Sequence, residues 1–523
     1  MASLPDWLSK LFDPSSFGDG HGSRAEQLAL ELSAAFLKTN RFSSDLEFSE
    51  LISSFKSSRL PQRGSTLEYV DFLGKKIVPH SLHSHAPRCL GHMTNVLPHF
   101  VHPIAHLMLA MNQNMVRGEA SKALTPFERQ TLAILHRLVF GAADAFYDRH
   151  VQDSESSLGV MTSGGTLANI AALWCARNEA LGPKDEFAGI EVEGLVAALA
   201  HHGFKDAVVV GSSLMHYSLT KAVDLLGLGT RNLLRVPVDA KNHVDVSGMR
   251  QTLLECREKR RRVLAVVGVA GTTDAGSVDP LARLAELCRE FEVHFHVDAA
   301  WGGPLLFSDK HRAKLKGVEL ADTVTLDAHK HMHLPLGIGM LMFRDPKLSR
   351  RLEMTAEYTI RKGSHDLGRR SIETSRAAST LFLHAGFSII GLDGYGQLID
   401  DSMQKTQYFV SAVKKRPGFE LLCQPEVSIV LYRYVQESLR EKSRAGTLSA
   451  EDQAAIGRVN EAIQKVQRRR GNAVVGRTAL KLSSFGDAPV VALRAVLANP
   501  LVRHEDIDWV LDEQSEIARS VSA

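Results

Sequence analysis

Two short stretches, Val297-Asp298-Ala299-Ala300 and Asp327-Ala328-His329-Lys330, indicate which fold this 523-residue chain adopts. Each follows a short apolar run, Val293 to Val297 and Thr323 to Leu326, that is typical of a buried strand. Open α/β sheets place their ligand crevices beyond the carboxyl ends of the strands. The sequence therefore predicts that an aspartate and a lysine meet at one rim of a parallel sheet.

A carboxylate and an amine at such a rim suit pyridoxal phosphate (PLP) as a cofactor. PLP forms a Schiff base with a lysine and needs an acid that holds a proton on its ring nitrogen. Asp298 is expected to be buried, and a buried carboxylate needs a partner such as a pyridinium nitrogen. Small residues at positions 299, 300, 302 and 303 leave room for a planar ring. Taken alone, the aspartate and the lysine could equally be structural.

The chain between about residues 155 and 345 alternates short β-rich runs with helical stretches. This alternation predicts a doubly wound α/β domain with a mostly parallel sheet. The expected strands are Val208–Val210, Leu233–Val236, Val263–Val269, Val293–Val297, Thr323–Leu326 and Gly339–Phe343.

Both ends of the chain differ from this central part. We predict an N-terminal helical arm over residues 1–120, a large cofactor-binding domain over 121–390 and a small C-terminal α+β domain over 391–523. The C-terminal prediction depends on three expected strands, at 428–435, 472–480 and 490–497. Residues 350–376 are polar and basic and are expected to form a loop.

Composition excludes several classes of protein. Charged residues make up 23% of the chain and its net charge is +3, so neither a nucleic-acid nor a membrane partner is expected. The five cysteines are scattered without a C-x-x-C pair, which favours a reducing, cytoplasmic location. The histidine-rich stretch from His80 to Pro103 fits no zinc pattern, and we expect no metal site.

Three further motifs follow predicted strands. Ser163-Gly164-Gly165-Thr166 opens a helix, where free backbone amides can bind a phosphate, although the same residues form ordinary turns and caps. His216 could stack on a flat cofactor, although a lone histidine at a strand end is more often structural. Gly271-Thr272-Thr273 offers hydroxyl groups at the same rim or a simple strand-to-helix turn. Each motif alone has an ordinary structural explanation. All of them at successive strand ends are far less expected by chance than any one of them.

With the C-terminal run Arg494-Ala495-Val496-Leu497-Ala498-Asn499-Pro500, these motifs resemble the group II PLP-dependent decarboxylases, relatives of glutamate and aromatic amino-acid decarboxylases. The resemblance covers about residues 65–515. Within the family the pattern is most similar to the bacterial PLP-dependent aspartate 1-decarboxylases. It implies a PLP-dependent transferase-like large domain (fold type I) and a homodimer with active sites at the subunit interface.

The resemblance also implies roles for individual residues. Lys330 would form the Schiff base, Asp298 would pair with the ring nitrogen, and His216 and Ala300 would contact the two faces of the ring. Arg494 would bind the substrate α-carboxylate through its planar fork. The residues implied to hold the phosphate or touch the ring are Ser163, Gly164, Gly165, Thr166, His329, Thr272 and Thr273.

The chain departs from the family pattern in three places. The common Asn-Pro-His-Lys is Asp327-Ala328-His329-Lys330 here. Glutamate decarboxylases carry Asn-Gln-Leu after a Pro-Arg pair, whereas this chain has Pro87-Arg88-Cys89-Leu90-Gly91-His92, so that His92 becomes a candidate substrate contact. The family's loop tyrosine, which donates a proton to the carbanion, has no clear match, and Tyr358 and His365 are the candidates.

We therefore expect α-decarboxylation of an acidic amino acid, with L-aspartate giving β-alanine and CO2. Glutamate, giving γ-aminobutyrate, is the alternative substrate. A carbon–carbon lyase resembling sphingosine-phosphate lyase and a non-catalytic protein that kept the fold are further alternatives. Retention of both Asp298 and Lys330 argues against the last.

Overall fold

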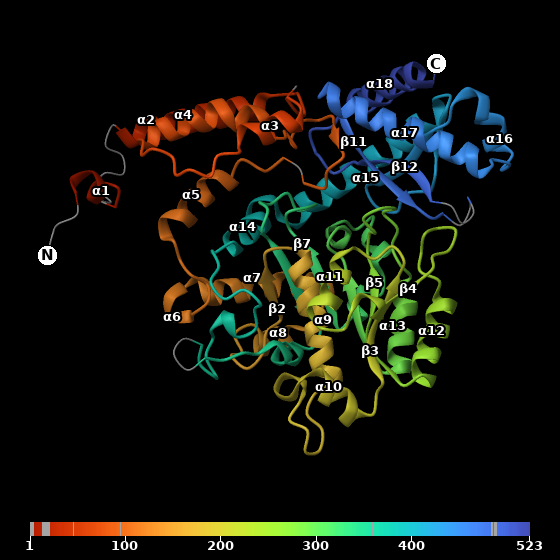
Figure 1. Ribbon diagram of the computed structural model, residues 1–523. Helices are drawn as coiled ribbons and strands as arrows, with labels where there is room; N and C mark the ends of the chain where they lie inside the picture. Colours follow the sequence, from red (N-terminus) through yellow and green to blue (C-terminus); the bar gives the residue numbers. More distant parts are fainter. Residues whose placement is uncertain are drawn as a thin grey trace.

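The structure, a computed structural model, describes residues 5–12, 21–44, 46–94, 96–356, 360–482, 485 and 489–522. A seven-stranded sheet with the order β2-β8-β7-β6-β5-β3-β4 forms its centre (Figure 1). Only β8 runs antiparallel to its neighbours, and all other neighbouring pairs are parallel. The strands are β2 (Gly159–Thr162), β3 (Asp206–Ser212), β4 (Leu233–Val236), β5 (Arg261–Val269), β6 (His294–Asp298), β7 (Thr323–Asp327) and β8 (Gly339–Phe343). The predicted α/β fold with a mostly parallel sheet is confirmed.

Helices cover both faces of this sheet. One face packs against α7, α12 and α13 around the largest hydrophobic core, and the other packs against α9, α10 and α11. The bounds of these helices are α7 (Leu124–Phe140), α9 (Gly165–Ala180), α10 (Ile190–His202), α11 (Ser218–Leu225), α12 (Val246–Glu258) and α13 (Leu281–Phe291); the short α8 spans Asp144–His150.

The N-terminal part is helical and extends along one side of the molecule (Figure 1). Its helices α2 and α4 pack against each other. The elements are α1 (Asp6–Lys10), α2 (His21–Lys38), α3 (Phe48–Ser54), α4 (Thr66–Lys76), α5 (Val101–Met111) and α6 (Gly118–Ser121).

The C-terminal part forms a second sheet of five strands in the order β1-β11-β12-β10-β9. Its first strand, β1 (Cys89–Leu90), comes from the N-terminal part and pairs in parallel with β11. The other elements are α14 (Thr380–Ala385), α15 (Gly391–Lys415), β9 (Phe419–Leu421), β10 (Ile429–Tyr434), α16 (Arg440–Arg444), α17 (Ala450–Arg470), β11 (Val474–Leu480), β12 (Val490–Val496) and α18 (His504–Ser522). The domain boundaries at residues 120 and 390 stay a prediction.

All six strands expected in the large sheet are present, and β2 is an additional edge strand that the sequence analysis missed. It is only four residues long and begins with Gly159, a residue type depleted in strands, so that its pattern is too short to stand out.

Strand β6 is polar on one face, although the sequence analysis treated it as an apolar run. Phe295 and Val297 point into the large hydrophobic core. Because side chains alternate along a strand, His294, His296 and Asp298 share the opposite face, beneath α9.

Among the described residues, no helix is both long and apolar enough to cross a membrane.

His136 of α7 ties three elements together within the core. Its side chain is fully buried, with Nε2 3.0 Å from the Phe343 carbonyl oxygen and Nδ1 3.0 Å from the Tyr147 hydroxyl. A carbonyl can only accept, so Nε2 carries the proton, and Nδ1 accepts from the tyrosine. Burial lowers the pKa of His136 to about 4.

This histidine makes stability depend on pH. An unfolded histidine has a pKa of about 6.5, so the unfolded chain binds the proton first as the pH falls, and stability is lost between about pH 6.5 and pH 4. Between pH 7 and pH 5, His136 should contribute a loss of about 2 kcal/mol. We predict that His136→Gln flattens this dependence, measured by urea unfolding at both pH values. An equally steep dependence in the variant would contradict the assignment.

Candidate active site

A cavity of about 440 Å³ lies beyond the carboxyl ends of the central strands. Its walls include the last residues of β5, β6 and β7 and the segments that follow β2 and β3. It is lined by Met93, Ser163, Gly164, Gly165, Thr166, Leu167, Asn169, His216, Val269, Gly271, Thr273, Asp298, Ala300, Trp301, Asp327, His329, Lys330, Leu336 and Gly337.

Most of the site residues expected from the sequence therefore meet in one cavity. Thr272, Arg494 and His92 do not line it. The Thr272 hydroxyl is fully buried and lies 2.9 Å from the Ser277 hydroxyl, so that of the two threonines only Thr273 reaches the cavity.

The amino terminus of α9 opens into the cavity without a cap. Gly164 precedes the helix with φ +151°, and no side chain caps the first turn. The first three residues of the helix, Gly165, Thr166 and Leu167, line the cavity. A Cβ atom on Gly165 would lie 2.8 Å from Asp327 Oδ2, so the position requires glycine. Uncapped amides at the positive end of a 16-residue helix form an anion site.

Lys330 is paired with Asp327, a residue that the sequence analysis did not select. Its Nζ lies 3.1 Å from Asp327 Oδ2, and the aspartate side chain is only 3% exposed. His329 Nε2 is 3.7 Å from the same oxygen. Asp327 Oδ1 and His329 Nδ1 are buried without a hydrogen-bond partner among the described residues. Two residues beside the lysine, both in the cavity wall, thus have an unsatisfied buried polar atom.

Asp298 is buried and hydrogen-bonded at both oxygens. Oδ2 accepts from the Asn169 side-chain amide at 2.9 Å, and Oδ1 accepts from the Ala300 backbone amide at 3.1 Å. The residue is 6% exposed. Each oxygen keeps a lone pair, so the carboxylate can accept a further proton donor from the cavity.

His216 lies on the cavity wall with its ring anchored on one side. Nδ1 is 2.8 Å from the Ser218 hydroxyl, and burial lowers the pKa of the ring despite the nearby Asp298 carboxylate. A neutral imidazole of fixed orientation is suited to stacking.

Arg494 of β12 approaches the same region from the C-terminal sheet. Its Nη1 donates to the Thr273 carbonyl at 2.7 Å and its Nη2 to the Gly91 carbonyl at 3.4 Å, while the buried Nε has no hydrogen-bond partner among the described residues. Burial lowers the pKa of this guanidinium. His92 lies within its electrostatic influence, since burial, Arg468 and Arg494 together lower the histidine pKa.

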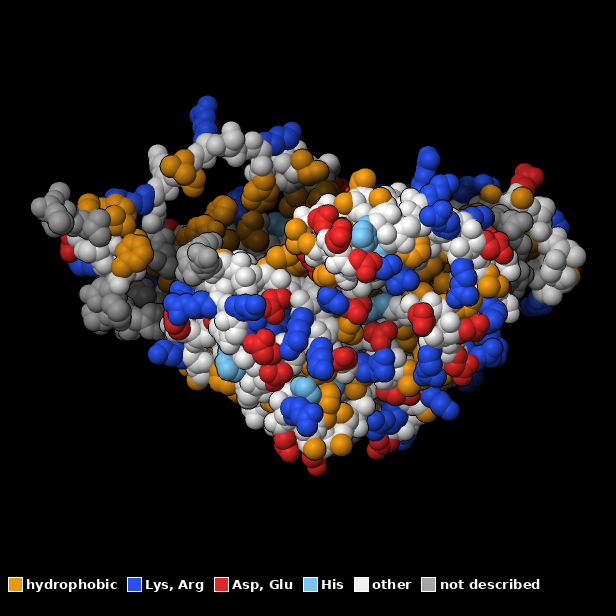
Figure 2. Space-filling view, turned by 90° about the horizontal axis from the view of Figure 1, so that it is seen from below, with side chains coloured by type: hydrophobic (Ala, Val, Ile, Leu, Met, Phe, Trp, Pro, Cys, Tyr) orange, Lys and Arg blue, Asp and Glu red, His pale blue; other side chains and the backbone are white. Residues whose placement is uncertain are grey.

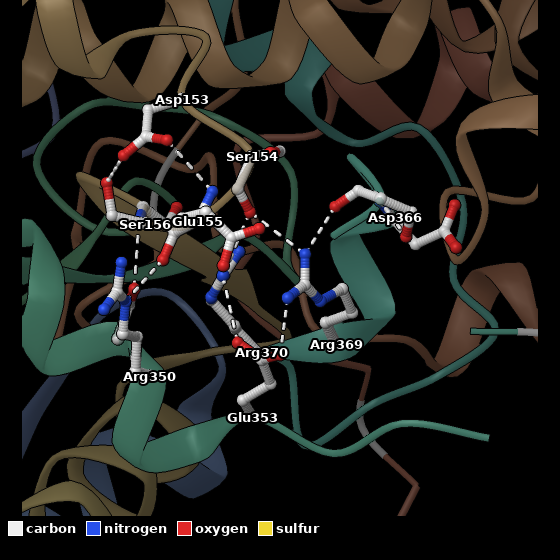
Figure 3. Close-up of polar contacts among 12 residues, drawn as sticks. Asp153, Ser154, Glu155, Ser156, Arg350, Glu353, Asp366, Arg369 and Arg370 are labelled. Carbon is white, nitrogen blue, oxygen red and sulfur yellow. Dashed lines mark hydrogen bonds and ion pairs between the residues drawn. The ribbon is translucent and has the colours of Figure 1, made fainter. Parts of the chain in front are cut away.

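The loop expected over residues 350–376 is anchored by buried arginines (Figure 3). Glu353 forms ion pairs with both Arg369 and Arg370, and both arginines donate to the Ser154 carbonyl. The two ends of this loop are therefore held to the same short segment of chain. Loop helices η7 and η8 span Pro346–Leu352 and Leu367–Arg369.

The two candidate proton donors lie on this loop. Tyr358 falls outside the described residues. His365 Nε2 donates to the Gln152 carbonyl at 3.0 Å, and the residue borders a different cavity of about 660 Å³. Within one chain, His365 is therefore not brought to Lys330.

Asn169 and His296 are the polar neighbours of Asp298 that the sequence analysis did not select. The sequence contained an indication of each. Asn169 is a polar residue inside the apolar helix run Leu167 to Trp174. His296 lies two residues before Asp298, on the same strand face. Buried polar residues of this kind indicate a hydrogen-bonded network.

Comparison with known proteins agrees with this geometry. Residues 53–435 match the family model described as the pyridoxal-dependent decarboxylase conserved domain. The chain is 41% identical to the aspartate 1-decarboxylase of Aliivibrio fischeri over 93% of this chain and 89% of that protein. It is 31% identical to the L-2,4-diaminobutyrate decarboxylase of Acinetobacter baumannii over 68% of this chain and 69% of that protein.

Solved structures share the fold. The crystal structure of mouse CSAD superposes with a TM-score of 0.84 at 24% identity and covers 97% of this chain and 99% of its own. Oryza sativa TDC, solved with PLP and tryptamine, superposes with a TM-score of 0.79 at 19% identity and covers 100% of this chain and 99% of its own. The family model spans well over half of the sequence, and its members share the cofactor that the lysine and aspartate indicate. The chain belongs to the pyridoxal-dependent decarboxylase family and is a PLP-dependent carboxy-lyase.

Proposed function

We propose that this enzyme removes the α-carboxylate of L-aspartate and releases β-alanine and CO2. The observation that carries the proposal is the 41% identity to an aspartate 1-decarboxylase across 93% of the chain. Relatives that act on other amino acids are more distant, as the 31% identity to a diaminobutyrate decarboxylase illustrates.

The cavity is suited to hold PLP. Its phosphate would occupy the uncapped amino terminus of α9, with the hydroxyls of Ser163 and Thr166 and the ring of His329 close by. The place of the His329 ring supports this position, because a Cβ atom on Gly164, directly before α9, would lie 3.4 Å from His329 Cε1.

The residues around the ring would each have one task. Lys330 supplies the amine, and Asp298 keeps a proton on the ring nitrogen through the lone pairs that its other hydrogen bonds leave free. His216 and Ala300, which both line the cavity, would contact the two faces of the ring, and Thr273 would lie beside it. When bound, PLP would supply an electron sink for the electron pair that stays on Cα when CO2 leaves.

Arg494 would orient the substrate through its α-carboxylate. Its hydrogen bonds go to two backbone carbonyls, and no described carboxylate forms an ion pair with it, although Asp274 is close enough to raise its pKa against the effect of burial. The guanidinium can therefore still bind an anionic ligand. Burial lowers the pKa of His92 most, and the cations Arg468 and Arg494 lower it further; their contribution indicates a positive potential suited to the second carboxylate of an acidic amino acid.

The five cysteines have free thiols, and four of them are buried. Such thiols support a reducing location, and we propose the cytoplasm.

The substrate is tested by measuring CO2 release from aspartate, glutamate, cysteine sulfinate, diaminobutyrate and aromatic amino acids. We expect kcat/KM for aspartate to exceed that for glutamate by about tenfold or more, because one methylene in a fitted pocket is worth about 1–3 kcal/mol. Lys330→Ala should abolish both turnover and the visible absorbance of bound cofactor. Preferential turnover of glutamate would establish the alternative substrate, and turnover of an aromatic amino acid alone would exclude an acidic one.

Replacing Arg494 tests the binding of the α-carboxylate. Arg494→Lys keeps the charge but loses the planar fork, and we expect KM for aspartate to rise about ten- to hundredfold while PLP affinity is retained. Arg477→Lys is the matched control on the neighbouring strand, where the arginine pairs with Glu461. An unchanged KM in Arg494→Lys would contradict the role.

We also propose that the enzyme is a homodimer with its active sites near the subunit interface. Helix α5 exposes apolar side chains, with Leu107 60% and Leu109 74% exposed. Figure 2 shows hydrophobic side chains gathered in a hollow between the N-terminal helices and the rest of the molecule. Leu336, which lines the active-site cavity, is 73% exposed. A second chain would cover such surfaces.

Disruption of α5 tests the dimer. The wild type should have twice the chain mass of 57.4 kDa by light scattering, and Leu109→Asp should shift it towards the monomer. Val196→Asp, on the distant helix α10 at a residue 84% exposed, serves as the control and should leave the mass unchanged. A monomeric wild type would refute the dimer, and an intact Leu109→Asp dimer would exclude α5 from its interface.

A further inference from the structure

A stripe of polar side chains is buried between the central sheet and helix α9. It consists of alternate residues of β6 and β7 on the face beneath that helix. In the register of these strands, His296 lies opposite Thr323, and Asp298 lies opposite Thr325. All four are less than 10% exposed. Polar groups are expensive to bury, so their arrangement requires an explanation.

Hydrogen bonds join three of these residues, with His294 and Asn169, into one hydrogen-bonded series that ends at Asp298. The Thr325 hydroxyl has no partner among the described residues and is not part of it. His294 Nε2 lies 2.8 Å from Thr323 Oγ1, which lies 2.9 Å from His296 Nδ1. His296 Nε2 is 3.0 Å from Asn169 Oδ1, and Asn169 Nδ2 donates to Asp298 Oδ2 at 2.9 Å. The chain therefore crosses from the sheet to α9 and back to the carboxylate.

The donor and acceptor groups of these side chains fix the direction of every hydrogen bond in the series. The Asp298 carboxylate accepts, so the Asn169 amide nitrogen faces it and the Asn169 oxygen faces His296. His296 must then carry its proton on Nε2. Burial lowers its pKa to about 4, so the ring is neutral and Nδ1 accepts from the Thr323 hydroxyl. That hydroxyl in turn accepts from His294, and every donor points towards Asp298.

Asn169 has a second branch that reaches His216. Its Nδ2 also donates to the Ser218 hydroxyl at 2.9 Å, and that hydroxyl lies 2.8 Å from His216 Nδ1. Both amide hydrogens and the amide oxygen are thus engaged. One side chain of α9 joins the carboxylate below the cavity to the imidazole on its wall.

We propose that Asn169 is a positioning residue that fixes Asp298 for the cofactor. The donors behind it, from His294 onward, hold the Asn169 amide so that its nitrogen faces Asp298. The inference rests on the proposed role of Asp298 towards the ring nitrogen. Asn169 also separates Asp298 from the histidines, because a neutral amide does not relay a proton as an imidazole does.

A purely structural role for Asn169 makes a different prediction. If the network only held α9 on the sheet, its loss would weaken binding of any ligand of the cavity. If it acts through Asp298, its loss affects only ligands with a ring nitrogen. The carbon analogue of PLP, in which CH replaces the ring nitrogen but the aldehyde and phosphate remain, separates the two.

The experiment measures dissociation constants of the apoenzyme for PLP and for this carbon analogue, followed by protein fluorescence. We expect Asn169→Asp to weaken PLP binding roughly ten- to hundredfold and to change binding of the analogue less than about threefold. His296→Leu, which removes the donor to Asn169 and the acceptor of the Thr323 hydroxyl but leaves Asn169 in place, should cause a smaller loss with the same selectivity. It also serves if Asn169→Asp does not fold, as judged by thermal melting.

Two controls make the outcomes distinct. Asn178→Asp is a matched exchange on the same helix, at a buried asparagine that donates to the Arg351 carbonyl, and should leave the affinity ratio unchanged. Asp298→Ala should lose the preference for PLP altogether. If Asp298→Ala keeps that preference, the proposed role of Asp298 fails. A second outcome is that Asp298→Ala loses the preference, but Asn169→Asp weakens the binding of both ligands equally or of neither. In that case the role of Asp298 stands and only the inference about Asn169 is overturned.

Discussion

The hydrogen bond from the Asn169 amide to the Asp298 carboxylate is the contact on which the rest of the site depends. A carboxylate that is 6% exposed is stable only when donors surround it, and among the described residues Asn169 and the Ala300 amide donate to it. This bond joins α9 to the end of β6. The uncapped amides at the start of α9 lie about one turn before Asn169, on the same helix. Helix α9 therefore contributes both the anion site and the donor to Asp298.

Much of the fold and of the site could be predicted from the sequence because function is concentrated at strand ends. Apolar runs followed by Asp298 and Lys330 identify both the sheet and its rim. Residues inside elements were missed for a physical reason: His296 and Asn169 occupy positions where a periodic pattern expects apolar side chains. Their role depends on which strand face lies under which helix, and that requires the assembled sheet.

The residues proposed to contact the substrate were harder to predict from the sequence. Arg494 and the Gly91 to Met93 segment reach the region from a second sheet, whose strand β1 is contributed by the N-terminal part of the chain. Spacing along the chain does not predict such a pairing. Asp327, the partner of Lys330, was quoted as a departure from the family pattern but not selected, since its contact with the lysine arises only when the turn after β7 is folded.

The central claim is that Asp298, held by a directed chain of donors, keeps a proton on the ring nitrogen of PLP. The most direct measurement is the 15N NMR shift of enzyme reconstituted with PLP labelled at that nitrogen. We predict the shift of a protonated pyridinium in the wild type at neutral pH and of an unprotonated ring in Asp298→Ala. An unprotonated ring nitrogen in the wild type would contradict the account.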